Sequence, residues 1–412
     1  MTESLPGCRS CGQVDLRVVL SLGKMPLANA LLTAEQLREP ESTYPLDLAF
    51  CSHCTLVQII ETVPPERLFS RYLYLSSYSE TMLRESKQLA EHLIESRALN
   101  SNSLVVELGS NDGYQLQYFV AKGIPVLGID PAQNVAEIAE ARGVRTLCDF
   151  FGKKLADELR GRSVSADVII AKNVLAHVAD LNGFVGGIGT LLKEDGVAVI
   201  EVPYVKDMID RREFDTIYHE HLCYFSLTAL RRLFKKHGMA LADVERIPIH
   251  GGSLRLYVSH EGHGQPRDSV RSLLLDEAEW GVNHVEAYVD FAQEVEMVKA
   301  SLRSLLKSLK ADRNRIAAYG AAAKGTVLLN YCGIGDDLLE FVADLSPYKQ
   351  GHYMPGVHLK ICHPSRLLEE MPDYTLLLAW NFADEVLEQQ AEYRRRGGRF
   401  IIPIPEPRVV VP

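Results

Sequence analysis

The stretch Leu104-Val-Val-Glu-Leu-Gly-Ser-Asn-Asp-Gly113 decides the fold of this 412-residue chain. Its apolar half predicts a buried strand, and Gly109 and Gly113 bracket a loop before a helical segment over 114–122. Glycine permits positive φ and a close approach of the backbone to a ligand. Because a parallel sheet binds ligands beyond the carboxyl ends of its strands, we expect a cofactor at this loop.

The residues of the loop indicate which cofactor it binds. The loop lacks both the three-glycine dinucleotide fingerprint and the Lys-Ser/Thr ending of a P-loop. Glu107 and Asp112 would repel a pyrophosphate but suit a cation, such as the sulfonium and ammonium groups of S-adenosylmethionine. The stretch resembles motif I of class I methyltransferases, with an ordinary strand-to-helix turn as the alternative. We therefore expect cofactor contacts from Glu107, Gly109, Asn111, Asp112 and Gly113.

Composition and charge limit the possible partners. With 47% hydrophobic and 24% charged residues, the chain is typical of a soluble globular protein. Since no apolar run reaches transmembrane length and no signal pattern opens the chain, we expect a cytoplasmic protein without a membrane partner. The formal net charge of -10 disfavours a nucleic-acid surface. We expect a small-molecule substrate and a monomer or small homo-oligomer.

Four of the eight cysteines form two Cys-x-x-Cys pairs, Cys8/Cys11 and Cys51/Cys54. Two such knuckles are typical of tetrahedral thiolate ligation of zinc. A disulfide framework is not expected in a large chain without a signal peptide, and a redox pair would need only one motif. Four protein ligands leave no open position, so this zinc should hold the fold and do no chemistry.

The order of predicted elements indicates three domains, over 1–70, 71–265 and 266–412. The first is a small zinc-binding module of short strands. In the second, strands and helices alternate from residue 104 to 202, which implies a parallel sheet. Two consecutive strands follow at 241–247 and 253–259, and without a helix between them they should pair antiparallel. An antiparallel hairpin closing a parallel sheet is the class I methyltransferase pattern.

A helical stretch over 269–310 leads to a second α/β series. Strands at 315–319, 339–343, 374–379 and 399–404 and a helix at 384–396 predict a smaller Rossmann-like domain. Its loop Gly320-Ala-Ala-Ala-Lys-Gly325 precedes a helix N-terminus, which attracts phosphate. Lys324 adds a positive charge, so we expect a substrate pyrophosphate here, with a loop kept only for packing as the alternative.

Other polar residues at strand ends extend the expected cofactor site. Asp130 ends the second strand, where a carboxylate can accept two ribose hydroxyls, although it could instead cap a helix. Asp149 matches the position that flanks adenine in methyltransferases. Lys172 and Asn173 follow the fourth strand and should border the sulfonium, with Asn173 favoured as the contact and a solvated side chain as the alternative for Lys172.

His177 and the run Tyr218-His-Glu-His221 are the acid–base candidates. Histidine has the pKa for proton transfer near neutrality. Glu220 could orient an imidazole, and Tyr218 could donate to a developing oxyanion. A solvated turn is the alternative interpretation.

Several motifs in one order resemble the sugar C-methyltransferases that build branched deoxysugars on nucleotide carriers. They are the paired Cys-x-x-Cys, the glycine loop, Leu-Ala-His177, Ile-Tyr-His-Glu-His-Leu-Cys-Tyr-Phe-Ser226, His250-Gly-Gly-Ser253 and Tyr-Gly-Ala-Ala-Ala-Lys324. The resemblance implies that His221 is the base, supported by Tyr218, Glu220 and His177. This chain carries His219 where those enzymes usually have an acid, which leaves the exact substrate open.

The reaction implied is methylation of a dTDP-like 4-keto-deoxysugar by removal of the C3 proton and attack of the enolate on the methyl group. Transfer to nitrogen or oxygen of another acceptor is the alternative within enzymes. A zinc-ribbon interaction protein with a vestigial methyltransferase fold is the alternative from another class. The residues expected to contact the substrate are Tyr72, Tyr74, Tyr78, His250, Ser253 and Lys324; the three tyrosines could equally form an aromatic core.

Overall fold

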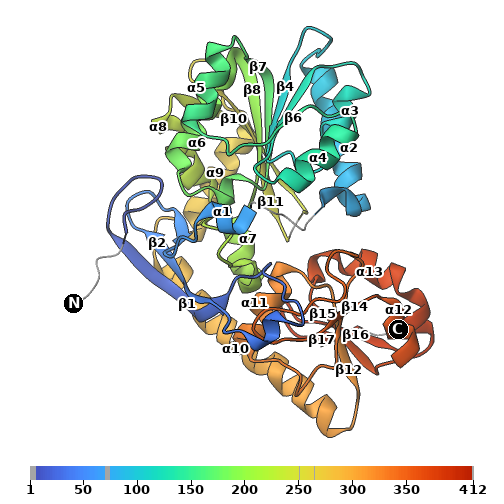
Figure 1. The fold of residues 1–412 in the computed structure, drawn as a ribbon. Coiled ribbons are helices and arrows are strands. Elements are labelled where there is room, and N and C mark those ends of the chain that lie inside the picture. The colour runs from blue at the N-terminus through green and yellow to red at the C-terminus, as the bar shows by residue number, and fades with distance from the viewer. Residues whose placement is uncertain (1–5, 70–74, 250, 264, 411–412) are drawn as a thin grey trace.

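The computed structural model describes residues 6–69, 75–249, 251–263 and 265–410. Three sheets organise the chain: an N-terminal sheet, a seven-stranded central sheet and a six-stranded C-terminal sheet (Figure 1). The division of the chain into domains over 1–70, 71–265 and 266–412 stays a prediction. Within the described ranges, no helix is both long and apolar enough to cross a membrane.

The N-terminal sheet is antiparallel and takes its last strand from far along the chain. Its order is β1 (Leu16–Pro26), β2 (Thr43–Cys51), β3 (Val57–Ile59) and β9 (Cys223–Tyr224). Val57 pairs with Tyr224 and Gln58 with Cys223. Because β9 comes directly after the Tyr218–His221 run, the cysteine-bearing module and the acid–base candidates belong to one hydrogen-bonded unit, which the sequence did not predict.

The central sheet confirms the expected class I methyltransferase arrangement. Five parallel strands are followed by an antiparallel pair at one edge, in the order β10-β11-β8-β7-β4-β5-β6. The strands are β4 (Val105–Leu108), β5 (Val126–Ile129), β6 (Thr146–Leu147), β7 (Ala166–Lys172), β8 (Leu192–Pro203), β10 (Met239–Ile247) and β11 (Ser253–His260).

Helices cover both faces of this sheet, as its apolar strands require. In β7, Val168 and Ile170 pack into one hydrophobic core, whereas Ile169 and Ala171 pack into another, as the alternation of side chains along a strand dictates. Figure 1 shows one group of helices on each side of the sheet. They are α2 (Glu80–Ser96), α3 (Gln117–Val120) and α4 (Gln133–Ala141) on one side, and α5 (Lys153–Gly161), α6 (Leu181–Leu191) and α8 (Leu227–Lys236) on the other.

Two helices, α9 (Asp268–Trp280) and α10 (Glu286–Ala311), lead to the C-terminal unit. The stretch expected to be helical over 269–310 is divided because Gly281 ends α9 in the left-handed conformation. The expected helix at 384–396 is also two, α13 (Ala383–Gln389) and α14 (Ala391–Arg395).

The C-terminal sheet is parallel except at one edge, where β17 runs antiparallel to β16. The remaining elements of this unit are β12 (Ile316–Tyr319), α11 (Ala323–Cys332), β13 (Val342–Ala343), β14 (Ile361–Cys362), α12 (Ser365–Glu370), β15 (Tyr374–Leu377), β16 (Arg399–Ile402) and β17 (Arg408–Val409).

The N-terminal module also packs on the C-terminal unit. Strand β1 runs beside α10 and α11 in Figure 1. After β1, the Thr326 hydroxyl donates to the Ala28 carbonyl at 2.9 Å, and Leu32 and Tyr353 exchange two backbone hydrogen bonds. The module therefore holds the central sheet and the C-terminal unit around a common space.

Candidate active site

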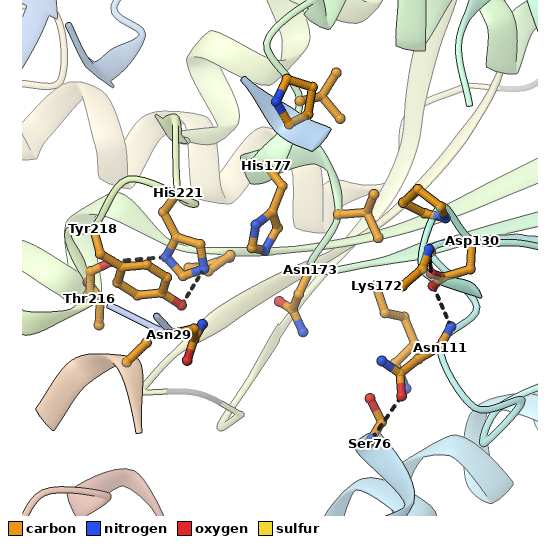
Figure 2. Close-up of a pocket in the computed structure, with 18 of the residues that line it drawn as sticks. Asn29, Ser76, Asn111, Asp130, Lys172, Asn173, His177, Thr216, Tyr218 and His221 are labelled. Atoms are coloured by element: carbon orange, nitrogen blue, oxygen red, sulfur yellow. Dashed lines mark hydrogen bonds between the residues drawn. The ribbon is translucent and has the colours of Figure 1, made fainter. Parts of the chain in front are cut away.

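A cavity of about 620 Å³ lies at the carboxyl ends of the central strands and reaches the C-terminal unit. All three parts of the chain contribute to its wall. Figure 2 shows Asn111 and Asp130 at one end, Tyr218 and His221 at the other, and His177 and Asn173 between them. Its lining includes Asn29, Gly109, Asn111, Asp130, Asp149, Lys172, Asn173, His177, Glu213, Thr216, Tyr218, His221, Lys324 and Lys349.

The glycine loop is built to approach the cavity closely. Gly109 has a φ of 67°, and a Cβ atom there would lie 2.4 Å from Val174 Cγ2. The amide of Asn111 donates to Asp130 Oδ2 at 2.8 Å, and the amide of Ala132 donates to Asp130 Oδ1 at 2.9 Å. These bonds fix the Asp130 carboxylate at the end of β5, where it lines the cavity.

The residues at this end fit S-adenosylmethionine. Each Asp130 oxygen keeps a second lone pair for a ribose hydroxyl after accepting one amide. Asp149 lines the same region beside Phe150 and Phe151, whose rings offer an apolar wall to an adenine. Among the described residues, no donor pairs with Asn173 Oδ1, and this residue also lines the cavity. Gly109, Asn111, Asp130, Asp149 and Asn173 thus all line the cavity, and their contacts with the cofactor stay predictions.

Three residues expected to touch the cofactor lie behind the cavity wall. Asp112 is fully buried and accepts a hydrogen bond from Arg142 Nη1 at 3.0 Å. Glu107 is fully buried in β4, where burial raises the pKa of its carboxyl against the opposing charge of Lys172. Gly113 is needed for packing, because a Cβ there would lie 3.0 Å from Val144 Cγ2. The structure therefore corrects the expectation of direct contact: these residues shape the loop from behind.

Lys172 is not the solvated side chain that the sequence left as an alternative. It is 5% exposed, and its Nζ donates to Ser86 Oγ at 3.0 Å and to Gln115 Oε1 at 3.3 Å. Ser86 is in α2 and Gln115 lies just before α3, so Lys172 ties the end of β7 to α2 and to the segment before α3.

Tyr218 and His221 form a hydrogen-bonded pair on the cavity wall. His221 Nδ1 lies 2.9 Å from the Thr216 carbonyl oxygen, and His221 Nε2 lies 2.9 Å from the Tyr218 hydroxyl (Figure 2). Since a carbonyl only accepts, Nδ1 carries the proton, and the lone pair of Nε2 accepts from the tyrosine. The imidazole is thus held with its basic nitrogen toward Tyr218 and the cavity.

His177 lies beside this pair in the short helix η3 (Leu175–His177). Its ring centroid is 4.8 Å from that of His221, with the two rings nearly perpendicular. Burial lowers the pKa of His177 to about 4. His177 is therefore neutral near pH 7 and does not oppose a positive charge on His221.

Glu220 does not orient the His221 imidazole, contrary to the expectation, because the Thr216 carbonyl does so. The Glu220 carboxylate instead accepts from Asn29 Nδ2 at 2.7 Å, and it is absent from the cavity lining. Burial raises the pKa of Glu220 to about 7, opposed by the hydrogen bond from Asn29. His219 faces the N-terminal module, where its Nε2 lies 3.1 Å from the Pro45 carbonyl oxygen. The departure from the sugar-enzyme pattern at this position thus lies away from the cavity.

The C-terminal end of the cavity carries the positive charges. Lys324 is in the first turn of α11, and its Nζ lies 4.4 Å from the centre of the Trp380 ring. Within the described chain, this buried Nζ has no hydrogen-bond partner, and the residue lines the cavity. Burial lowers the pKa of Lys324, opposed by the charges of Asp215 and Glu213. Lys349 lies nearby and donates to the Ala321 carbonyl at 2.8 Å.

Other expected substrate residues are not at the cavity. Tyr78 is 56% exposed, and Ser253 is buried with its hydroxyl donating to the Ile249 carbonyl at 3.0 Å. Neither is part of the lining, so the structure does not support their proposed contacts. Tyr72, Tyr74 and His250 lie outside the described residues.

Sequence reasoning missed Asn29, Glu213, Thr216 and Lys349. Asn29 and Lys349 come from regions far from the central sheet in sequence, and no motif marks them. Glu213 and Thr216 are close to the Tyr218–His221 run, so their proximity was the one signal available. Their roles depend on a carbonyl and on charges that only the fold brings together.

The four cysteines expected to bind zinc meet in the N-terminal module. The Sγ atoms of Cys8 and Cys54 are 3.5 Å apart, those of Cys11 and Cys51 are 3.6 Å apart, and all four lie within 4.8 Å of one another. A tetrahedral zinc with Zn–S bonds of about 2.3 Å separates its sulfurs by roughly 3.8 Å. The cluster therefore fits a structural zinc ion.

Comparisons with known proteins agree with this geometry. Three family profiles match in succession: a zinc binding domain over residues 8–69, a methyltransferase domain over 80–244 and a C-methyltransferase C-terminal domain over 248–405. C-methyltransferase NovU from Streptomyces niveus is 37% identical over 404 residues, which are 98% of this chain and 96% of that protein.

Two further matches cover only part of the chain. A ubiquinone biosynthesis O-methyltransferase from Bartonella quintana (strain Toulouse) is 27% identical over 24% of this chain and 40% of its own length. The structure of an S-adenosylmethionine-dependent methyltransferase from Clostridium acetobutylicum ATCC 824 covers 44% of this chain and 92% of its own, with 12% identity and a TM-score of 0.35.

The near full-length match decides the family, and it favours carbon over nitrogen or oxygen as the methyl acceptor. It also favours an enzyme over an interaction protein with a vestigial fold. The chain belongs to the C-methyltransferase family and is an S-adenosylmethionine-dependent C-methyltransferase with a structural zinc site.

Proposed function

We propose that this enzyme methylates a carbon next to the ketone of a nucleotide-linked 4-keto-deoxysugar. The observation that carries the proposal is the Tyr218–His221 pair, which shares one cavity with the glycine loop and with Lys324, whose buried Nζ makes no hydrogen bond to a described residue. A base is required because a C–H bond must be broken before carbon can accept a methyl group. When bound, S-adenosylmethionine supplies the electrophilic methyl group that the enolate carbon accepts.

His221 is the proposed base. Its Nδ1–H bond to the Thr216 carbonyl directs the Nε2 lone pair toward the cavity, and that carbonyl also stabilises the imidazolium formed when Nε2 takes the C3 proton. The Tyr218 hydroxyl, which donates to Nε2 in this structure, turns its hydrogen to the C4 oxygen of the substrate and stabilises the enolate. The neutral His177 ring leaves the charge on His221 unopposed.

The C-terminal end of the cavity is proposed to hold the pyrophosphate of the substrate. Helix α11 begins at Ala323. Its first backbone hydrogen bond of the helical i→i−4 kind runs from the Thr326 amide to the Ala322 carbonyl. The amides of Ala323, Lys324 and Gly325, in the first turn of α11, have no helical partner and can donate to phosphate oxygens. Lys324 Nζ, which is buried and makes no hydrogen bond to the residues described, adds the positive charge that a diphosphate needs.

The test is turnover of a thymidine-diphosphate-linked 4-keto-6-deoxysugar with S-adenosylmethionine in deuterium oxide. We expect a methyl group on carbon, located by NMR, and exchange of the C3 proton by the S-adenosylhomocysteine-bound enzyme. His221→Asn should abolish both while S-adenosylhomocysteine affinity, measured by calorimetry, stays within about twofold. A methyl group on oxygen or nitrogen would contradict the proposal.

Two variants complete the test. His219→Asn is the matched control, because this histidine belongs to the same run but faces Pro45, and it should retain turnover. Tyr218→Phe should keep exchange at a reduced rate, since the base remains. Loss of exchange as complete as in His221→Asn would instead assign proton removal to the Tyr218 oxygen.

A further inference from the structure

Asn29 is placed at the cavity by the N-terminal module rather than by either Rossmann-like unit. It lies at a turn in which the Ala30 amide donates to the Leu27 carbonyl at 3.1 Å. The turn is anchored to the C-terminal unit by the bond from the Thr326 hydroxyl to the Ala28 carbonyl. The Asn29 side chain thereby lies beside Tyr218 and His221 in Figure 2, on the same side of the cavity.

The Asn29 carboxamide is held in one orientation. Its Nδ2 donates to Glu220 Oε1 at 2.7 Å, and Glu220 is 3% exposed and lies behind the cavity wall. With the nitrogen turned to Glu220, the carboxamide oxygen is the atom left for a ligand, and no described residue donates to it. A carboxamide oxygen accepts hydrogen bonds and donates none.

We propose that Asn29 is a substrate-binding, specificity-determining residue whose Oδ1 accepts a hydrogen bond from a hydroxyl or amino group on the sugar beside the reacting carbon. Glu220 is the positioning residue that fixes the Asn29 carboxamide through Nδ2, so its effect on the reaction passes through Asn29 rather than through His221. This inference rests on the proposed function, because that function supplies the sugar.

A double-mutant cycle tests the pathway from Glu220 to the substrate. The KM for the thymidine-diphosphate-linked keto-sugar and the Kd for S-adenosylhomocysteine are measured for the wild type, Asn29→Ala, Glu220→Gln and the double variant. Loss of one neutral hydrogen bond raises the acceptor KM about three- to tenfold in Asn29→Ala, with the cofactor Kd unchanged. Glu220→Gln raises it less, and adds nothing in the Asn29→Ala background.

Asn182→Ala is the matched control. Asn182 also joins the N-terminal module to the central unit, because its Nδ2 donates to the carbonyls of Arg9 and Ser10 at 2.9 and 3.2 Å, but it does not line the cavity. It should leave the acceptor KM unchanged. Zinc content and cofactor affinity report whether each variant is folded, and Asn29→Ser, which suits the same turn, replaces the alanine variant if that one is not.

The outcomes separate this inference from the proposed function. An unchanged acceptor KM in folded Asn29→Ala, with wild-type turnover intact, overturns the role of Asn29 alone. Additive effects of the two substitutions overturn the role of Glu220 as a positioning residue acting through Asn29. Absence of binding and turnover of the keto-sugar by the wild type would overturn the proposed function and, with it, this inference.

Discussion

The loop after β4 and the loop after β12 share one backbone design but face the cavity with opposite charges. In both, a glycine with positive φ donates its amide to the last residue of the neighbouring strand: Gly109 to the Ile129 carbonyl and Gly320 to the Ala343 carbonyl, each at 2.7 Å. In both, a Cβ on the glycine would collide with the loop that follows the strand on the other side.

The aspartates that follow these neighbouring strands extend the correspondence. Asp130 and Asp344 each accept one amide from the glycine loop and one from the residue two positions further on, at 2.7 to 2.9 Å. The donors are Asn111 and Ala132 in the central unit, and Ala321 and Ser346 in the C-terminal unit.

The side chains around the two loops differ in charge. Asp130 and Asp149 line the cavity in the central unit, where Lys172 also lines it, whereas Lys324 and Lys349 line it at the C-terminal loop, where Glu213 lies near Lys324. The ten-residue α11 also begins immediately after the C-terminal loop, and its N-terminus favours an anion. The backbone therefore sets where a ligand lies, and a few side chains decide whether that ligand is a cation or an anion.

The largest effects on ligand affinity are expected from replacing Gly109 or Gly320 with alanine, and each substitution should weaken the binding of a different ligand. Gly109→Ala would put a Cβ 2.4 Å from Val174 Cγ2 at a positive φ, and strain of about 1–3 kcal/mol corresponds to roughly 5- to 150-fold weaker S-adenosylmethionine binding. Gly320→Ala, with its Cβ 2.7 Å from that of Ala379, should weaken thymidine diphosphate instead. Calorimetry with both ligands on both variants checks this, and loss of the same ligand in both variants would show that the two loops do not bind different ligands.

Lys324→Met tests the charge of the C-terminal loop. Hydrogen bonds to charged groups contribute about 1.5–3 kcal/mol, so removing the buried ammonium should weaken thymidine diphosphate binding at least about tenfold, with S-adenosylhomocysteine affinity unchanged. Lys360→Met, at an exposed position of the same unit, is the control. Unchanged affinity for thymidine diphosphate would mean that the Gly320–Gly325 loop serves only packing.

Features that depend on residues close together in the sequence could be predicted, whereas contacts between residues far apart in the sequence could not. The strand–loop–helix order around Gly109 and Gly320, the antiparallel hairpin and the cysteine pairs are local patterns, and the structure has all of them. The position of Asp130 at the cavity could be predicted for the same reason, since this residue directly follows a recognisable strand.

Contacts between distant segments could not be read in this way. Glu107 and Asp112 carry the right charge for a sulfonium, but neither lines the cavity. Glu107 lies on the face of its strand that is turned away from the cavity, and Asp112 is paired with Arg142, 30 residues away in the sequence. Glu220 was assigned to His221 because the two are adjacent, whereas its partner is Asn29, 191 residues away. The pairing of β9 with β3 likewise joins segments that no local pattern connects.

A pH experiment tests the charge at the C-terminal end of the cavity, because Glu213, an acid with a raised pKa, lines the cavity near Lys324. Burial raises the pKa of Glu213 from near 4.5 to about 8, opposed by Lys324 and Arg211 and reinforced by Asp215 and Asp207. The folded protein thus holds this proton more tightly than the unfolded chain. The stability it contributes is complete below about pH 4.5 and is lost as the pH rises through about 8.

Thermal unfolding of the wild type and of Glu213→Gln between pH 5 and 8.5 measures this contribution. The Tm of the wild type should fall relative to that of the variant as the pH rises, because glutamine does not ionise. Glu194→Gln, at an exposed position, should follow the wild type. Parallel curves for wild type and Glu213→Gln would show that the Glu213 carboxyl is not protonated in the folded state.

The smallest effect on binding is expected at Asp112, and it distinguishes the two acids of the central loop. Asp112 is fully buried against Arg142 and away from the cavity, whereas Asp130 lines it. Asp112→Asn should keep S-adenosylmethionine affinity within about threefold and cost about 1 kcal/mol of stability, since Arg142 is more than a third exposed. Asp130→Asn, in contrast, should weaken binding about tenfold by removing a charged acceptor of the ribose hydroxyls. Equal losses of affinity in the two variants would mean that Asp112 reaches the cofactor and that the acidity of the whole loop, rather than one carboxylate on its wall, selects the cation.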